Sequence, residues 1–133
     1  MILSMSRPKI RVVSATRRLV ATFPSVVLAV DTSAEIQMVL AELHTGVPED
    51  EQVRIRIGIN LGDVIEDRGE VFGEGVNLAA RLEAAAEPGG ICISAATHDQ
   101  CRSKCTITFC DGGSQSFKNI TEPVGVFHWS RGC

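Results

Sequence analysis

The segment at residues 53–59 (VRIRIGI) constrains the fold more than any other part of this sequence. Its β-branched residues alternate strictly with two arginines and a glycine. This is the pattern of a half-buried β-strand, apolar on one face and polar on the other. A strand of this kind predicts a sheet covered on one side, so the neighbouring segments decide the fold class.

Three other segments have helical patterns. Apolar residues between Pro24 and Gly46 recur at spacings of three and four, and proline at a first helical position starts a helix without losing a needed donor. A second helix is predicted at about 76–86, where the Pro-Gly-Gly sequence at 88–90 ends it. A third, short helix is predicted at 95–101.

Short strands account for most of the remaining chain. Residues 91–94 predict a buried strand, and residues 66–69 predict the tip of a hairpin that follows residues 64–65. Weaker strand patterns occur at 10–13, 19–23, 106–110, 116–120 and 124–129, with a turn at 111–113. Strands and helices that alternate, with hairpins between them, predict an α+β fold whose helices pack on one face of a sheet.

Length and charge exclude several classes of protein. The chain of 133 residues is long enough for one buried core and too short for two. Its 13 Lys and Arg against 16 Asp and Glu give a net charge of −3, which disfavours binding of nucleic acid through its phosphates. No apolar run reaches the roughly 18 residues of a membrane span, and the N-terminus has no signal-peptide pattern. We therefore expect a cytoplasmic protein without a membrane span.

The cysteines allow two interpretations. They number five, at positions 92, 101, 105, 110 and 133, with no Cys-x-x-Cys pair, so a disulfide framework is a poor interpretation. His98, Cys101 and Cys105 have a spacing that would place them along one helix as zinc ligands. Free thiols, buried or half-exposed, are the interpretation that we favour.

Asn77 and Arg81 are the first candidate functional residues. They are four residues apart and therefore share one face of the predicted helix. The positions three and four residues from Arg81 hold no acidic residue, so its guanidinium has no local partner. It must point into water, reach a carboxylate elsewhere in the fold, or bind the anionic group of a ligand.

Two weaker signals lie nearby in the sequence. Gly73-Glu74-Gly75 precedes the helix and allows a phosphate-loop interpretation, but the acidic residue would repel phosphate and a flexible lead into the helix is favoured. Lys118 falls on the predicted strand at 116–120, where alternation places it opposite Phe117.

Several spaced motifs resemble a known family. They are IGINLGDV at 57–64, VFGEGVNLAARLE at 71–83, AEPGGI at 86–91, and FKNI at 117–120 followed by Pro123-Val124. In their order and separation they are similar to the catalytic domain of class III adenylate and guanylate cyclases, in its bacterial branch. The resemblance runs from about residue 19 to 129, which divides the chain into an atypical segment at 1–18 and a partial cyclase domain at 19–133.

The resemblance implies a ferredoxin-like α+β fold that dimerises and builds its active site across the subunit interface. In that site the 3′-hydroxyl of a nucleoside triphosphate attacks the α-phosphate and expels pyrophosphate, with two metal ions held by two aspartates of one subunit. The partner subunit supplies the other groups. By resemblance these are Asn77 for the ribose, Arg81 for the transition-state phosphate, Lys118 for the triphosphate, and Glu70 as the acid that recognises the base.

This chain departs from the family at the metal site. The resemblance implies that the first metal aspartate, the phosphate loop and the opening strand and helix precede the region matched here, so we expect the fold to lack them. The second metal aspartate matches Arg17, and the lysine that selects the base matches Val13. A guanidinium cannot lose its proton to accommodate a cation, so we expect no metal bound by this chain, with Mg²⁺ or Mn²⁺ supplied by a partner.

Three functions follow from these observations, and enzymatic activity stays open. A working cyclase is implied by the family, although the residue at the metal site contradicts it. A cyclase-homology partner would donate Asn77, Arg81 and Lys118 to a homodimer or to a heterodimer with another cyclase domain. A non-catalytic interaction module that kept the fold is the alternative. The loss of resemblance before residue 19 leads to the hypothesis of a gene fragment or shifted reading frame, with exposed apolar surface or marginal stability.

Overall fold

The computed structural model describes residues 2–4, 11–15, 18–62, 65–68 and 70–130. Three α-helices and nine strands occur within these ranges. In chain order the elements are β1 (Ile2–Ser4), β2 (Arg11–Ala15), β3 (Arg18–Thr22), α1 (Val26–Leu43), a 3₁₀ turn (Glu49–Glu51), β4 (Ile57–Asn60), β5 (Ile65–Asp67), β6 (Glu70–Phe72), α2 (Glu74–Ala85), β7 (Ile91–Ser94), α3 (Ala95–Cys101), β8 (Cys110–Gln115) and β9 (Val124–Trp129).

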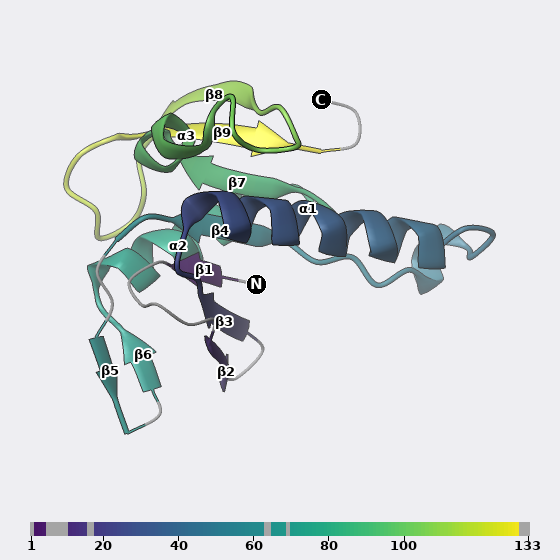
Figure 1. The fold of residues 1–133 in the computed structure, drawn as a ribbon, viewed down its shortest axis with the longest axis horizontal. Coiled ribbons are helices and arrows are strands. Elements are labelled where there is room, and N and C mark those ends of the chain that lie inside the picture. The colour runs from purple at the N-terminus through teal and green to yellow at the C-terminus, as the bar shows by residue number, and fades with distance from the viewer. Residues whose placement is uncertain (1, 5–10, 16–17, 63–64, 69, 131–133) are drawn as a thin grey trace.

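Seven of the strands form one mixed sheet in the order β2-β3-β1-β4-β7-β9-β8. Strands β3, β1, β4 and β7 run parallel to one another, whereas β2 and the β9-β8 pair are antiparallel to their neighbours. Strands β5 and β6 form a separate hairpin that projects from the body of the molecule (Figure 1). This architecture confirms the predicted α+β class.

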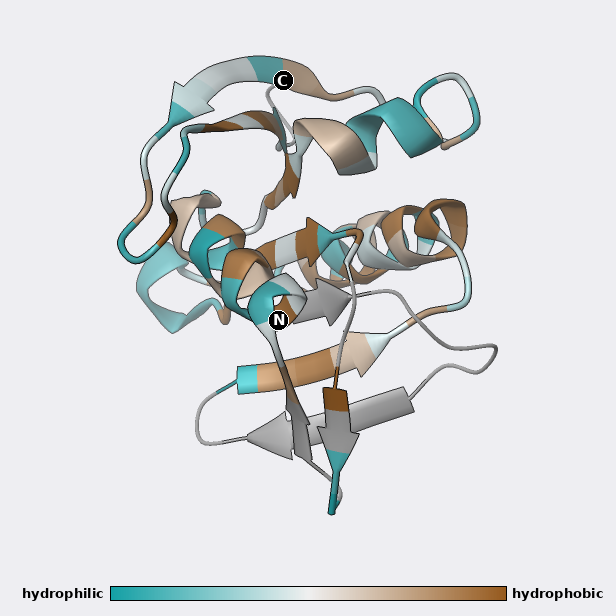
Figure 2. Ribbon diagram, turned by 90° about the vertical axis from the view of Figure 1, so that its left-hand side faces the viewer, coloured by the Kyte–Doolittle hydropathy of each residue, from teal (hydrophilic) through white to brown (hydrophobic). Residues whose placement is uncertain are grey.

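Helices cover both faces of the sheet, whereas the sequence pattern predicts one covered face. Ile57 and Ile59 point toward α1 and share the main core with Ala29 and Val30. Gly58, between them on β4, points the other way, against the backbone of α2. Figure 2 shows the sheet between the helices, with α1 and α3 to its right and α2 to its left. The strand predicted at 53–59 begins only at Ile57, and Val53, predicted on its apolar face, is exposed. All four residues of β4 are buried, so this strand is central and not half-buried.

Helix α1 begins two residues later than predicted. Ser25 caps it, because its side-chain oxygen accepts a hydrogen bond of 3.1 Å from the backbone N–H of Leu28, an interaction typical of serine at this position. Pro24 therefore precedes the cap. Within the helix, the buried amide of Gln37 donates to the carbonyl oxygens of Ile55 and Gly90 at 3.0 and 2.9 Å. These bonds hold α1 against the segments that lead into β4 and β7.

The outer surface exposes large apolar side chains. Met38, Val39 and Leu43 are exposed on α1, and Ile65 and Phe72 face each other across the β5-β6 hairpin. The predicted exposure of apolar surface is therefore present among the described residues. No helix in these ranges is both long enough and apolar enough to cross a membrane.

The N-terminal strand patterns are confirmed in part. Strands β2 and β3 correspond to the patterns at 10–13 and 19–23, and they pair antiparallel. Strand β1 lies between β3 and β4, a position that the short apolar pair Ile2-Leu3 does not predict. Its pairing depends on contacts that are distant in sequence, which a local pattern does not contain.

Two predicted strands near the C-terminus are wrong. The strand expected at 106–110 begins only at Cys110 and continues to Gln115, with an irregularity between Asp111 and Ser114 where a turn was expected. In the segment predicted as a strand at 116–120, residues 117–120 form a turn, in which Asn119 has a φ of +65°. That left-handed conformation is incompatible with a regular strand. The predictions agree with the structure for the β5-β6 hairpin, whose turn includes Arg68, and for strands β7 and β9.

Candidate functional site

Helix α2 presents Asn77 and Arg81 on its outer side. Gly73 precedes the helix with a φ of +126°, a conformation that favours glycine, and its carbonyl oxygen accepts from the N–H of Asn77 at 3.0 Å. The buried side of the helix is made of Gly75, Ala79 and Leu82. Asn77 is consequently exposed and Arg81 half-buried.

The structure brings Asn77, Arg81 and Lys118 together around one pocket of about 290 Å³. Asn77 and Arg81 come from α2, and Lys118 comes from the turn between β8 and β9. Arg18, at the start of β3, lines the same pocket. The remaining lining residues are Ala80, Ala84, Asn119 and Ile120. Residues predicted as one functional group from distant parts of the sequence thus share one cavity.

The turn that carries Lys118 is closed by a hydrogen bond and anchored at Phe117. The N–H of Ile120 donates to the carbonyl oxygen of Phe117 at 3.2 Å. The Phe117 ring packs against the apolar cluster of Leu82, Ala86, Cys92 and Val126, which lies beneath α2. The anchored ring holds the exposed Lys118 at the rim of the pocket beside α2.

The charge of this pocket is positive. Among the described residues that line it, three side chains are cationic and none is a carboxylate. Arg18 forms an ion pair with Glu83 of α2, with 3.4 Å between Nε and Oε1. Arg81 has no ion pair or hydrogen bond within the described ranges, in agreement with its lack of an acidic neighbour along the helix. Such a pocket is suited to a polyanionic group such as phosphate.

Three further positions that the resemblance points to lie wholly or partly outside the described residues. Glu70 begins β6, where it pairs with Asp67 across the hairpin, but its side chain lies outside the described residues. Arg17, which stands at the position of the second metal aspartate, also lies outside them, and the side chain of Val13 does too. The roles predicted for these positions stay predictions.

The residues around the pocket do not fit a divalent cation. Magnesium and manganese are bound through oxygen ligands, mainly carboxylates, and the lining side chains are cationic, amide or apolar. No group of three or more His, Cys, Asp or Glu side chains is placed to hold a metal within the described ranges.

The zinc interpretation has no support among the described residues. The His98 ring stacks on Phe127, with 3.7 Å between ring centroids, and packs edge-on against Phe109. Cys92, Cys101 and Cys105 are free, as favoured above, and burial raises the pKa of each of the three. Cys110 differs from the prediction, because it is disulfide-bonded.

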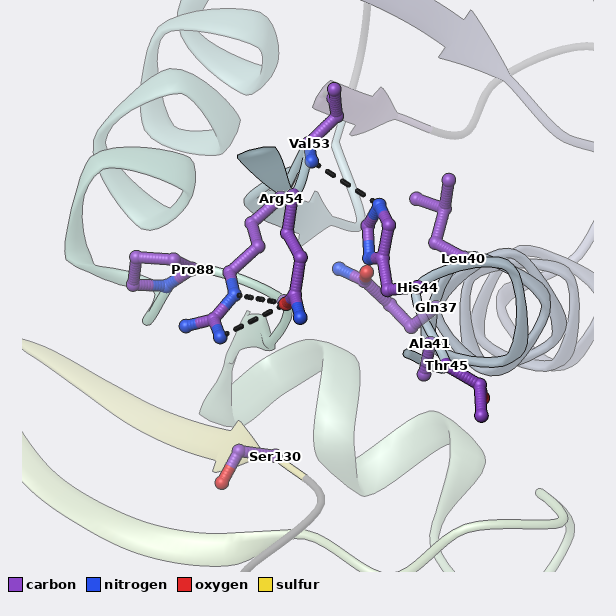
Figure 3. Close-up of a pocket in the computed structure, with 11 residues that line it drawn as sticks. Gln37, Leu40, Ala41, His44, Thr45, Val53, Arg54, Pro88 and Ser130 are labelled. Atoms are coloured by element: carbon purple, nitrogen blue, oxygen red, sulfur yellow. Dashed lines mark hydrogen bonds between the residues drawn. The ribbon is translucent and has the colours of Figure 1, made fainter. Parts of the chain in front are cut away.

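Two other cavities contain none of the predicted catalytic residues. Figure 3 shows the one beside the C-terminal end of α1, of about 390 Å³, where the N–H of Val53 donates to Nε2 of His44 and Arg54 bonds to Gln52. A wider one, of about 700 Å³, includes Gly73, Glu74 and Gly75. Here Glu74 is exposed, and its carboxylate disfavours the phosphate-loop interpretation of this sequence.

Known proteins resemble this chain in sequence and in fold. The family described as the adenylate and guanylate cyclase catalytic domain matches residues 9–125. This chain belongs to that family. A protein of Rhizobium meliloti named putative adenylate cyclase 3 is 42% identical over 108 residues, which cover 81% of this chain and 18% of that protein. This chain of the cyclase family therefore spans about a fifth of the length of that relative.

Solved cyclase structures share the fold. The adenylate/guanylate cyclase/hydrolase of Silicibacter pomeroyi superposes with a TM-score of 0.85 and 38% identity, over 90% of this chain and 72% of that one. The adenylyl cyclase CyaB of P. aeruginosa superposes with a TM-score of 0.70 and 23% identity, over 90% of this chain and 70% of that one. The second likeness concerns the fold alone.

The comparisons confirm the resemblance on which the site was predicted. Sequence reasoning found Asn77, Arg81 and Lys118, but it did not find Arg18 or Asn119 as pocket residues. The two adjacent arginines at 17–18 are a sequence feature that could have indicated a cationic site. Nothing local indicated that β3 places Arg18 beside α2.

Proposed function

We propose that this chain is the Asn- and Arg-donating half of a dimeric nucleotidyl cyclase site and makes no cyclic nucleotide alone. The observation that supports the proposal is the pocket in which Asn77, Arg81 and Lys118 meet, with no carboxylate among the lining residues that the structure describes. In the family reaction, ATP is converted to cyclic AMP and pyrophosphate. The carboxylates that hold the metal ions would have to come from a partner domain.

Each pocket residue has a chemical role in this proposal. Arg81 binds oxygens of the α-phosphate through two of its N–H groups and stabilises the charge that develops there. A guanidinium with no partner among the described residues is suited to this role. The neutral amide of Asn77, one helical turn earlier, orients the ribose so that its 3′-oxygen is in line for attack. Lys118, on its anchored turn, binds the outer phosphates, and Glu70 is proposed to contact the base.

The proposed partner is a second cyclase domain, either another copy or a complete homologue. Two copies of this chain would assemble two cationic half-sites without metal ligands at position 17, so a homodimer is expected to be inactive. A complete homologue would supply the missing carboxylates and form one functional site. The cytoplasm, where nucleoside triphosphates are available, is the proposed location.

Complementation tests this proposal. The chain is mixed with a complete class III cyclase whose residues at the positions matching Asn77 and Arg81 have been replaced, so that neither protein alone is expected to be active. Formation of cyclic AMP by the mixture, and its loss with Arg81→Ala, is the expected result. Activity of this chain alone with Mn²⁺, or an inactive mixture, would overturn the proposal.

A non-catalytic interaction module is the second candidate. The exposed apolar residues Met38, Val39 and Leu43 on α1 favour it, because large adjoining apolar side chains on a surface are typical of contacts with other proteins. Calorimetry with ATP separates the two candidates. Binding that weakens in Arg81→Ala supports the half-site, whereas no binding by the chain alone or in the mixture supports the module.

A further inference from the structure

We infer that Arg18 is a third phosphate-binding cation, which lets this pocket bind a nucleoside triphosphate that carries no metal ion. This inference rests on the proposed function, because it concerns the same pocket. It adds a phosphate-binding side chain that the cyclase resemblance does not supply. It also assigns the pocket a preference for the free polyphosphate over the magnesium complex of that polyphosphate.

The position of Arg18 is the first observation. It lies at the start of β3, and it lines the pocket with Arg81 and Lys118. The three cationic side chains come from a strand, a helix and a turn that are distant in sequence. They therefore surround the cavity from separate elements instead of lying along one exposed face.

The contact between Arg18 and Glu83 is the second observation. Glu83 accepts at the Nε of Arg18, at 3.4 Å. A guanidinium has five N–H donors in a planar fork, so this contact leaves its terminal NH₂ groups available. Within the described ranges they have no other partner. The side chain of Arg18 is 49% exposed and that of Glu83 is 14% exposed, so the half-buried carboxylate holds the guanidinium while the outer edge of the guanidinium stays accessible.

The balance of charge gives the expected preference. Each Mg²⁺ that binds a triphosphate cancels two of its negative charges and occupies phosphate oxygens. Among its described lining residues the pocket offers three cations and no carboxylate, although Glu83 pairs with one of the cations, Arg18. The pocket therefore offsets part of the charge of the free polyphosphate without a metal ion, and these residues include no ligand for one. In this pocket Arg18 supplies positive charge that the metal ions supply in complete cyclase sites.

Calorimetric titration of the full chain tests the inference. Sodium tripolyphosphate and ATP are titrated separately, each in EDTA and again in excess Mg²⁺, so that the contributions of phosphate and nucleoside are distinguished. The variants are Arg18→Gln, which removes the charge, and Arg18→Lys, which keeps the charge and removes the fork. Arg102→Gln, an exposed arginine at the end of α3 that lines none of the three cavities described above, is the matched control.

The expected result has three parts. Both probes bind in EDTA, and excess Mg²⁺ weakens the binding. Arg18→Gln weakens it about tenfold, as loss of one charged phosphate contact does. Arg18→Lys weakens it less than Arg18→Gln, and Arg102→Gln changes it by no more than about twofold. Because Arg18→Gln also removes the ion pair with Glu83, thermal melting is measured for each variant, and Arg18→Lys gives the comparison if Arg18→Gln does not fold.

The opposite results separate this inference from the proposed function. If ATP binds only with Mg²⁺, or if Arg18→Gln binds as the wild type does, the role of Arg18 is wrong and the half-site proposal stands. If Arg18→Lys binds more weakly than Arg18→Gln, charge at this position is not what holds the phosphates, and the inference fails. If neither probe binds in any buffer while complementation succeeds, the inference alone fails. If complementation fails as well, both are overturned.

Discussion

Gly58 of β4 lies directly against Ala79 of α2, so closely that a Cβ atom on Gly58 would overlap the carbonyl oxygen of Ala79. The same atom would overlap the backbone nitrogen of Glu83, one turn later. The missing side chain thus lets α2 rest on the central strand. The contact sets the distance of α2 from the sheet and, with it, the position of Asn77 and Arg81 relative to Arg18.

We predict that Gly58→Ala lowers the free energy of unfolding by about 3 kcal/mol or more, because neither backbone group of α2 can move aside separately. Chemical denaturation measures this change. Gly46→Ala is the matched control, since Gly46 has a φ of +80° with no atom near its Cβ position, and its cost is expected to be about 1 kcal/mol. Equal effects of the two substitutions would show that α2 is not packed as closely as described.

Most of the polar residues of the candidate site can be predicted from the sequence. The family motif identifies Asn77, Arg81 and Lys118, and the helical spacing alone indicates that the first two share a face. Both features are local: a helix with a small-residue core side and a motif of fixed spacing. The sequence therefore predicts three of the polar residues that line the pocket, but not Arg18 or Asn119.

The missed parts depend on long-range packing. Arg18 reaches the pocket because β3 is positioned by β1 and β2, and strand pairing of this kind leaves no local pattern. Residues 116–120 are predicted as a strand, yet Phe117 packs against the apolar cluster beneath α2 and anchors a turn. Packing of Phe117 against the apolar cluster under α2 favours the turn. The residues of that cluster lie elsewhere in the sequence, so the segment itself does not predict the turn.

A buried hydroxyl on β3 gives a second prediction. Thr22 is 2% exposed, and its Oγ1 has no hydrogen-bond partner within the described part of the chain. We expect Thr22→Val to raise the free energy of unfolding by about 1 kcal/mol, because an unpaired polar atom is replaced by a methyl group of similar size.

Thr97 is the matched control for this substitution. It is equally buried, but its Oγ1 accepts from the N–H of Leu61 at 3.0 Å and bonds to Oγ of Ser94 at 2.7 Å. Thr97→Val is expected to lower the free energy of unfolding by about 1–3 kcal/mol, because it leaves these partners unpaired. Destabilisation by both substitutions to the same extent would mean that Thr22 has a partner.

The thiol of Cys92 predicts a loss of stability in alkali. Burial raises its pKa from the ordinary value of 9.0 to about 12. Below pH 9 the thiol is protonated in both the folded and the unfolded chain. Between pH 9 and pH 12 the unfolded chain releases the proton and the folded chain keeps it, so the free energy of unfolding falls as the pH rises.

Denaturation of Cys92→Ala across this pH range measures the effect of the thiol. The variant is expected to lose less stability with rising pH than the wild type, although it is less stable at neutral pH. Val126→Ala, in the same apolar cluster, leaves a void without removing a thiol and should follow the pH dependence of the wild type. Identical pH dependence in Cys92→Ala and the wild type would contradict the assigned burial.

Ionic strength distinguishes the roles of the two residues on α2. Attraction between the cationic pocket and ATP is screened by salt, so the affinity should fall as the NaCl concentration rises. Arg81→Gln is expected to weaken binding about tenfold at low salt and to make the remaining affinity less dependent on salt, because one of the charges has been removed. Asn77→Ala removes a neutral amide and should leave the salt dependence unchanged while it weakens binding of ATP more than binding of tripolyphosphate. Titrations of both variants over a range of NaCl concentrations test this assignment. A reduced salt dependence in Asn77→Ala would contradict the assignment of Arg81 to the phosphates and Asn77 to the ribose.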